Sequence, residues 1–301
     1  MKKLLVSFSG GETSAYMAQW LWNHKRNDFE MIFVFANTGQ ENEETLEFVE
    51  KCSNHFGFPV VWVEAKVYPE MGKGNTFKIV DFESADRSGQ TFEAAIAKHG
   101  IPNTNTPHCT RELKQVPINK FARSLGWKSY YTAIGIRSDE ADRINSKAKQ
   151  LKLIYPLVSR EMQPMTKPKI NFWWSQQPFR LNLKGYQGNC KWCWKKGNPK
   201  LYQIAKETPQ FFYFPALMEK KYGEFVPESR LKKMNDRGEK PLLPVRFFRQ
   251  NRSVNDIINE AEKWEGSVFD DSRHYAIQHD LFEDNDLIGG ESCEVFSECG
   301  S

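Results

Sequence analysis

The chain has 301 residues, of which 40% are hydrophobic and 14% aromatic, and its formal net charge is +4. This composition supports one large or two modest domains with a real core and excludes global disorder. No apolar run approaches the roughly 20 residues that span a bilayer, and the run after Met1-Lys2-Lys3 breaks at Ser9, so we expect a cytoplasmic protein with reduced thiols and no membrane partner.

The first half of the chain alternates strand and helix patterns. Apolar runs rich in β-branched or aromatic residues predict strands, and helical patterns lie between them. Buried parallel strands joined by helices predict an α/β fold with a doubly wound, mainly parallel sheet, whose ligands sit at the carboxyl ends of the strands. The predicted strands are Leu4–Phe8, Met31–Ala36, Val60–Glu64 and Tyr130–Ile134, and the main helices between them are Ser14–His24 and Glu43–His55.

A glycine-rich turn follows the first predicted strand. It reads Ser9-Gly10-Gly11-Glu12-Thr13-Ser14 and leads into a helix. Glycines let the backbone turn tightly and approach a ligand, the helix N-terminus presents N–H groups to an anion, and the hydroxyls add donors. A β-turn capped by Ser or Thr is the alternative interpretation.

Two further strand ends carry polar motifs. After the second strand comes Asn37-Thr38-Gly39, a few residues before a helix; a simple turn and helix start would also explain it. After the fourth strand comes Gly135, followed by Arg137 and Arg143, whose guanidinium groups suit phosphate or sulfate. A surface helix with acid–arginine pairs is the alternative there.

Between these segments, residues 66–107 form a long excursion with one short helix near Phe92–Lys98. Long ordered loops are more often functional than filler.

Together these motifs resemble the PAPS reductase family of the PP-loop (ATP pyrophosphatase) superfamily. The turn resembles the PP-loop S-G-G-x-D/T-S, and Asn37–Thr45 resembles D-T-G-x-x-x-x-E-T, with Asn in place of the usual Asp. Gly135–Arg143 resembles G-I/Q-R-x-D/E-E/S-x-x-R, and Tyr155-Pro156-Leu157 matches a downstream segment. The resemblance covers about residues 3–200. It implies an adenine nucleotide alpha hydrolase-like fold and an adenine nucleotide held by Ser9, Gly10, Gly11, Thr13, Ser14, Asn37, Thr38, Gly39, Gly135, Arg137 and Arg143.

Beyond Leu157 the pattern changes to Trp- and Pro-punctuated segments and helices, Pro209–Tyr222 and Val254–Trp264 among them. We therefore predict a PP-loop nucleotide-binding domain over residues 1–183 and a smaller helical C-terminal region over 184–301. Lys and Arg are in excess over 184–263, and Asp and Glu over 264–301. A solvated basic face with an acidic tail would explain this, and so would a surface that binds nucleic acid.

The six cysteines suggest a second kind of site. Cys52 lies in a helical pattern and is best explained as a small buried apolar residue. Cys190 and Cys193 form C-x-x-C, which in a cytosolic chain indicates a metal site or redox pair. Cys109 lies in a segment that loosely resembles C-C-x-x-R-K-x-x-P of the iron–sulfur APS reductases, with His108 at the position of their first Cys. A site of Cys109, Cys190, Cys193 and His108 would hold a 4Fe–4S cluster or zinc, although adjacent residues of one strand seldom point the same way; inert or redox thiols are the alternative.

The end of the chain, Glu298-Cys299-Gly300-Ser301, resembles the E-C-G-I/L-H tail of PAPS and APS reductases, whose Cys attacks sulfur. A frayed tail with an incidental Cys299, and Cys293 as a spare thiol, is the alternative.

Three functions follow from the resemblance. The complete loop favours ATP with Mg²⁺, attack at the α-phosphate and adenylation-linked sulfur transfer to an acceptor such as nucleic acid, as in DndC-like enzymes, with a sulfur donor as partner. The second is reduction of PAPS or APS by Cys299 with a thiol reductant protein, which the acidic tail disfavours because it raises a cysteine pKa. The third is an inactive nucleotide-binding module.

Overall fold

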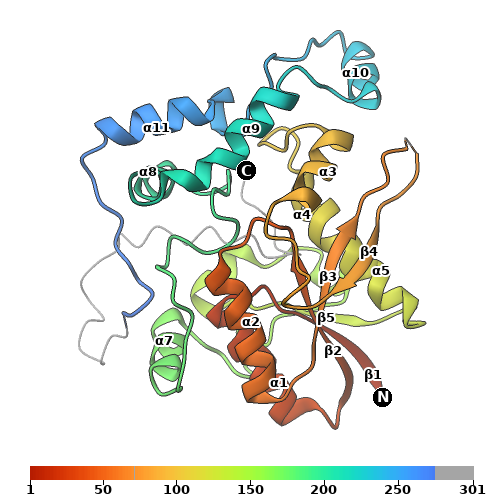
Figure 1. Cartoon of the computed structure of the whole chain (residues 1–301). Coiled ribbons are helices and arrows are strands. Elements are labelled where there is room, and N and C mark those ends of the chain that lie inside the picture. The colour runs from red at the N-terminus through yellow and green to blue at the C-terminus, as the bar shows by residue number, and fades with distance from the viewer. Residues whose placement is uncertain (71, 275–301) are drawn as a thin grey trace.

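The computed structural model describes residues 1–70 and 72–274, and Cys293 and Cys299 lie outside these ranges. A six-stranded sheet has the order β4-β3-β2-β1-β5-β6. Its strands are parallel except β4, which pairs antiparallel with β3 at the edge (Figure 1). The strands are β1 (Lys2–Ser7), β2 (Phe29–Asn37), β3 (Val60–Lys66), β4 (Thr76–Val80), β5 (Tyr131–Ala133) and β6 (Leu153–Ile154).

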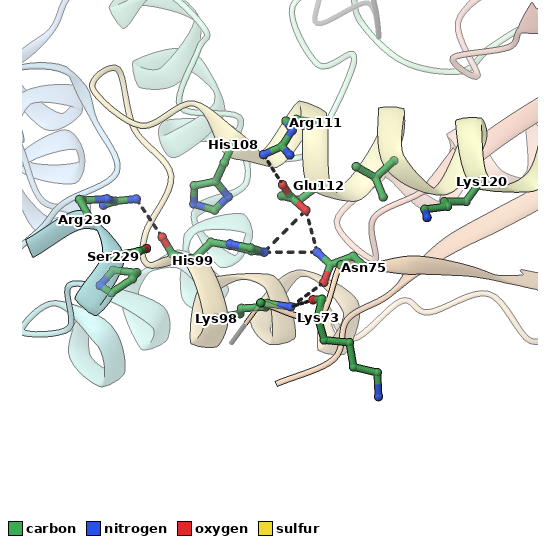
Figure 2. A pocket seen from close by; sticks show the side chains of 14 residues that line it. Lys73, Asn75, Lys98, His99, His108, Arg111, Glu112, Lys120, Ser229 and Arg230 are labelled. Atoms are coloured by element: carbon green, nitrogen blue, oxygen red, sulfur yellow. Dashed lines mark hydrogen bonds and ion pairs between the residues drawn. The ribbon is translucent and has the colours of Figure 1, made fainter. Parts of the chain in front are cut away.

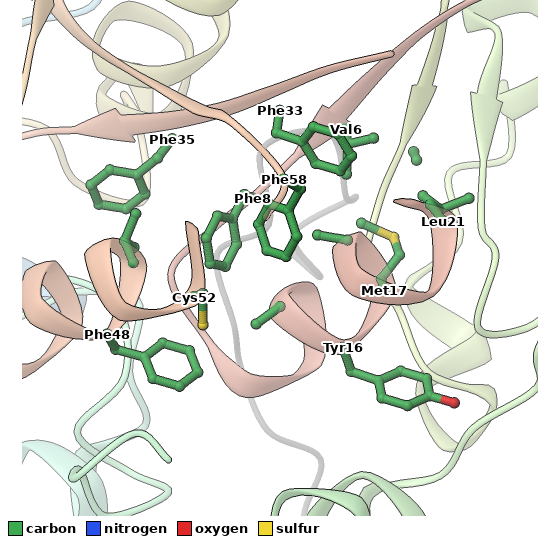
Figure 3. Close-up of a cluster of buried hydrophobic side chains, with 14 of the residues drawn as sticks. Val6, Phe8, Tyr16, Met17, Leu21, Phe33, Phe35, Phe48, Cys52 and Phe58 are labelled. Atoms are coloured by element: carbon green, nitrogen blue, oxygen red, sulfur yellow. The ribbon is translucent and has the colours of Figure 1, made fainter. Parts of the chain in front are cut away.

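Successive residues of a strand point to opposite faces of the sheet, and here both sets are apolar. Helices therefore cover both faces. Val6 and Phe33 point to the face covered by α1 (Glu12–Lys25), α2 (Glu43–Phe56) and α7 (Lys167–Ser175) (Figures 1 and 3). Leu5 and Val34 point to the opposite face, which is covered by α5 (Val116–Ser124). The prediction of a doubly wound α/β sheet is therefore confirmed. Cys52 is fully buried in the first of these cores, as expected.

The C-terminal part is helical, as predicted, and packs around a second core. Phe92 and Leu113 of the sheet-bearing part share this core with Trp192, Ile204 and Ile257. The proposed domain boundary at residue 183 stays a prediction. The helices and helical turns that complete the described chain are α3 (Gln90–His99), α4 (His108–Thr110), η1 (Arg111–Gln115), η2 (Ser138–Arg143), α6 (Ala148–Leu151), α8 (Asn198–Glu207), η3 (Pro209–Phe212), α9 (Tyr213–Tyr222), α10 (Glu228–Asn235), η4 (Arg249–Asn251) and α11 (Val254–Lys263).

None of the helices within residues 1–70 and 72–274 has the length and apolar character needed to cross a membrane.

Candidate nucleotide-binding site

The glycine-rich turn lies between the carboxyl end of β1 and the first turn of α1. Gly10 has φ +81°, a conformation that side chains rarely adopt. A Cβ at this position would lie only 2.6 Å from Cγ2 of Thr45, on α2. The turn therefore requires glycine for two separate reasons, conformation and space.

Ser14 holds the turn in shape from inside. Its Oγ accepts hydrogen bonds from the backbone N–H of Ser9, at 3.2 Å, and from the Ser9 hydroxyl, at 3.0 Å, and it donates to the Gly11 carbonyl at 2.9 Å. Gly11 is the N-cap of α1 and has no side chain to cap the first turn. This arrangement suits an anion, because the first N–H groups of a helix have no intrahelical acceptor.

The turn opens onto a cavity of about 600 Å³. Ser9, Gly10, Gly11, Thr13 and Ser14 line it, together with Gly135 and Arg137. Residues from two later stretches, 181–200 and 264–272, line much of the rest and bring aromatic rings with them. The cations around the cavity are Lys114, Arg137, Lys167, Lys184, Lys196 and Lys200, and the aromatic residues are Tyr186, Trp264 and Phe269. Four carboxylates, Glu12, Glu41, Glu140 and Asp271, line the cavity as well, so the six cations exceed them by two. A hollow of this size with an excess of cations fits an anionic nucleotide.

Arg137 connects the end of β5 to the turn. Its Nη1 donates to Oγ1 of Thr13 at 3.4 Å, and its guanidinium pairs with Asp139 at 3.0 Å and Glu140 at 3.2 Å. Arg143 pairs with the same Glu140 at 2.7 Å and does not line the cavity. The two arginines thus share one carboxylate, but only Arg137 reaches the cavity.

The segment Asn37–Gly39 is buried and does not line the cavity. Asn37 Nδ2 donates to Oε1 of Glu64 at 2.6 Å and to the Asp86 carbonyl at 2.9 Å. The Thr38 hydroxyl donates to Glu41 at 2.9 Å, and a Cβ at Gly39 would lie 2.4 Å from Asp86. These groups form a polar network at the end of β2, and their expected contact with a nucleotide stays a prediction.

The structure brings the C-x-x-C motif to the end of β2. Cys190 forms an isolated antiparallel bridge with Glu41, its Sγ lies 3.6 Å from Oγ1 of Thr38, and the Cys193 N–H donates to the Cys190 carbonyl at 3.1 Å. Burial, followed by the Glu41 carboxylate, raises the pKa of Cys190 to about 12; Cys109 is near enough to contribute in the same direction. Cys109 and Cys190 also both pack against the second core.

His108 is placed differently from the cysteines. Residues 108–124 are helical, so the neighbours His108 and Cys109 lie in a helical turn and not in a strand. His108 Nε2 lies 2.9 Å from the Gly100 carbonyl, and its ring lines a second pocket, shown in Figure 2. Burial lowers its pKa to about 4. Among the residues that the structure describes, no three His, Cys, Asp or Glu side chains are grouped to hold a metal ion, so as placed these residues do not fit a metal centre.

Several residues that line the cavity could not be predicted from the sequence. Lys167, Lys184, Trp264 and Phe269 were not singled out. The local excess of basic residues was a signal for the lysines. No such signal pointed to the aromatic rings, because no periodic pattern indicates that residues 264–272 line the same cavity as the glycine-rich turn.

Residues 3–153 match the phosphoadenosine phosphosulfate reductase domain. The chain is 28% identical over 300 residues to a protein of Escherichia phage lambda named "Uncharacterized nin region protein ORF290", a match covering 97% of this chain and 94% of that protein. It is 24% identical over 140 residues to "Uncharacterized protein MJ0066" of Methanocaldococcus jannaschii, covering 46% of this chain and 24% of that protein. The domain match spans half of the sequence and contains the turn, the end of β2 and Arg137, so the chain belongs to the phosphoadenosine phosphosulfate reductase family.

Proposed function

We propose that this protein binds ATP in the 600 Å³ cavity and acts at its α-phosphate. A nucleophilic oxygen of an acceptor attacks the α-phosphorus, the bond to the β-phosphate oxygen breaks, and pyrophosphate leaves. The acceptor becomes adenylated, which prepares that position for displacement by sulfur. The observation that carries the proposal is the complete turn Ser9–Ser14, which opens onto a cavity ringed by lysines and Arg137.

Each group around the turn would contact a different part of the triphosphate. The first turn of α1 and the hydroxyls of Ser9 and Thr13 would hold the leaving pyrophosphate, whose negative charge grows as the bond breaks. Arg137 would hold a second phosphate oxygen, since a guanidinium group pairs with oxyanions in a fixed geometry. Mg²⁺ would be held mainly by the phosphate oxygens and would neutralise their charge.

We propose nucleic acid as the acceptor, through the basic stretch 184–263. Exposed Lys232 and Lys233 of α10 support this, because they lie on a surface that is free to meet a phosphate backbone. The iron–sulfur or zinc centre stays a prediction from the cysteines, and no step above depends on it. An absorption spectrum and metal analysis of anaerobically purified protein test it directly.

A second candidate is reduction of PAPS or APS, which the family match favours. One experiment separates the candidates: pyrophosphate release from ATP, measured beside sulfite release from PAPS and from APS. We expect pyrophosphate release that depends on an acceptor. Sulfite without pyrophosphate would establish the reductase instead, and binding of ATP with neither product would indicate a module that has lost the chemistry.

A further inference from the structure

Phe269 lines the nucleotide cavity, and 64% of its surface is exposed. Its ring meets the ring of His274 at nearly a right angle, with the centroids 5.8 Å apart, and this contact leaves most of the residue uncovered. A single exposed phenylalanine on a convex surface needs no explanation. In the wall of a cavity, the same ring offers an apolar face to a ligand, as aromatic side chains commonly do in small-molecule sites.

The other two aromatic residues of the cavity are more deeply packed in the fold. Tyr186 is 4% exposed, and its hydroxyl donates to Glu207 at 2.8 Å. Trp264 is half-buried, and its ring packs against that of Tyr202 with the centroids 5.8 Å apart. Among the aromatic rings that line this cavity, Phe269 therefore has the largest exposed fraction.

Hydrogen bonds hold the backbone on both sides of Phe269. The N–H of Val268 donates to Oε1 of Gln203 at 3.3 Å. Two residues after Phe269, the carbonyl of Asp271 accepts from Nδ2 of Asn171, on α7, at 2.8 Å. In Figure 1 this segment is the blue chain that runs from α11 toward α7. A ring on a fixed backbone loses little conformational entropy when a ligand covers it.

The lining residues of the cavity offer two kinds of contact. The turn Ser9–Ser14 and Arg137 offer N–H, hydroxyl and guanidinium donors, which suit phosphate oxygens. Phe269 and Val268 offer apolar surface. A nucleotide has the same two parts, because its phosphates are charged and its base has flat faces that stack on aromatic rings.

We infer that the ring of Phe269 stacks on a nucleobase in this cavity. The inference rests on the proposed function, because it concerns the same cavity and the ligands that we place there. Two ligands supply this chemistry, the bound nucleotide through its own base and the nucleic-acid acceptor through an unpaired base. Stacking contacts the face of a base and not its hydrogen-bonding edge, so Phe269 favours ligands that carry a base without choosing among the bases.

Isothermal titration calorimetry with two pairs of probes tests the inference. α,β-Methylene-ATP is paired with tripolyphosphate, which has no nucleoside, and a thymidine hexanucleotide is paired with an abasic strand of the same length. We expect Phe269→Ala to lower the affinity for at least one base-containing probe about tenfold, the effect of losing one base stack, and to leave tripolyphosphate and the abasic strand unchanged. Phe269→Trp should keep the affinity, because it keeps an aromatic face.

Phe172→Ala is the matched control. Phe172 is 56% exposed on α7 and does not line the cavity, so this variant should bind every probe as the wild type does. Arg137→Ala should show the opposite pattern to Phe269→Ala, since it should weaken the binding of α,β-methylene-ATP and of tripolyphosphate alike.

The pattern of losses in Phe269→Ala identifies the ligand. A loss for α,β-methylene-ATP alone would assign the stack to the base of the nucleotide, and a loss for the hexanucleotide alone would assign it to the acceptor. Base-containing probes that bind Phe269→Ala as tightly as the wild type would overturn the inference and leave the proposed function standing. A loss that extends equally to tripolyphosphate or to the abasic strand would also overturn it, because it would show a structural effect.

Failure of the wild type to bind α,β-methylene-ATP would contradict the proposed function, and the hexanucleotide pair would then decide the inference by itself. Binding of neither base-containing probe to the wild type would overturn both.

Discussion

Arg137 Nη1 donates a hydrogen bond to Oγ1 of Thr13 across 3.4 Å. These residues belong to neighbouring strand-to-helix connections, after β5 and after β1, and the strands pair in the sheet. Gly135 allows the approach, because a Cβ there would lie 3.1 Å from Cα of Ser14. The contact places a cation, supported by Asp139 and Glu140, beside the turn that would receive phosphate.

Replacing Arg137 should therefore damage catalysis more than folding. We expect Arg137→Ala to lower kcat/KM for ATP-dependent pyrophosphate release about 100-fold, as for the loss of one preorganised donor to a developing charge. Arg137→Lys should recover part of the rate, because lysine keeps the positive charge but lacks the planar guanidinium group that makes two parallel hydrogen bonds. Arg160→Ala, an exposed arginine outside the cavity, is the control. Equal rates in Arg137→Ala and the wild type would remove Arg137 from the mechanism.

Gly10 offers a comparison between two glycines of similar conformation. Gly10 and Gly126 have φ +81° and +78°, but only at Gly10 would an added Cβ have neighbours within 4 Å, the nearest at 2.6 Å. Gly126→Ala should cost about 1 kcal/mol of stability from strain alone. Gly10→Ala should add the cost of overpacking, about 1–3 kcal/mol, and displace the turn, so that ATP binding is lost. Unfolding in urea and ATP titration measure both; ATP binding retained in Gly10→Ala would contradict the assignment of the turn.

Glu12 and Arg180 connect the turn to the C-terminal part. Arg180 Nε and Nη2 donate to the two oxygens of Glu12 at 2.9 and 2.8 Å, and Nη2 also donates to the Ser272 carbonyl at 2.6 Å. Both side chains are largely buried, at 13% and 10% exposure. Arg180→Leu leaves the Glu12 charge without this partner, and we expect it to cost about 3–5 kcal/mol in urea unfolding.

The double variant Glu12→Gln/Arg180→Leu distinguishes charge from packing. It should be more stable than Arg180→Leu alone, because it removes the unpaired charge. Both variants should raise the KM for ATP, since Arg180 holds the Ser272 carbonyl of the segment that covers the cavity. Glu12→Gln alone completes the cycle, and a loss in the double variant equal to the sum of the two single losses would show that the pair is not coupled.

The sequence predicted the parts of the fold that have strong periodic patterns. The parallel strands, the glycine-rich turn and the helices after it follow from buried apolar runs and glycine at a strand end. The edge strand β4 was missed because it lies largely on the surface and lacks a buried face. The helical segment 108–124 was missed because Pro117 lies inside it, where a proline usually interrupts a helix.

Some residues of the candidate site could be predicted from the sequence, and others could not. Ser9–Ser14 and Arg137 could be predicted, because each follows a strand whose carboxyl end lies at the cavity. Asn37 ends β2 and Arg143 comes after β5 of the same sheet, yet their side chains bind Glu64 and Glu140. Spacing along the chain does not reveal such pairing, and it places His108 beside Cys109 although its ring lines the second pocket.

Asp86 gives a pH-dependent prediction for the network at the end of β2. Its carboxylate accepts backbone hydrogen bonds from Ser88 at 2.8 Å, Gly89 at 3.0 Å and Thr91 at 2.7 Å. Burial raises the pKa of Asp86, but the hydrogen bonds from Thr91 and Ser88 outweigh it and hold the pKa below its ordinary value. The carboxylate therefore stabilises the fold above about pH 4, the usual pKa of an unfolded Asp, and this contribution is lost as the pH falls through the lower folded pKa.

Asp86→Asn should accordingly destabilise the protein by about 1–3 kcal/mol at pH 7, because its amide group faces backbone donors. The difference from the wild type should stay constant from pH 6 to about pH 4, the usual pKa of an unfolded Asp, and shrink as the pH falls further toward the lower folded pKa. Urea unfolding across this range measures it, with Asp236→Asn, an exposed residue just after α10, as the matched control. A difference that stays constant down to pH 3 would show that the charge of Asp86 does not stabilise the network, and that only the shape of the side chain matters there.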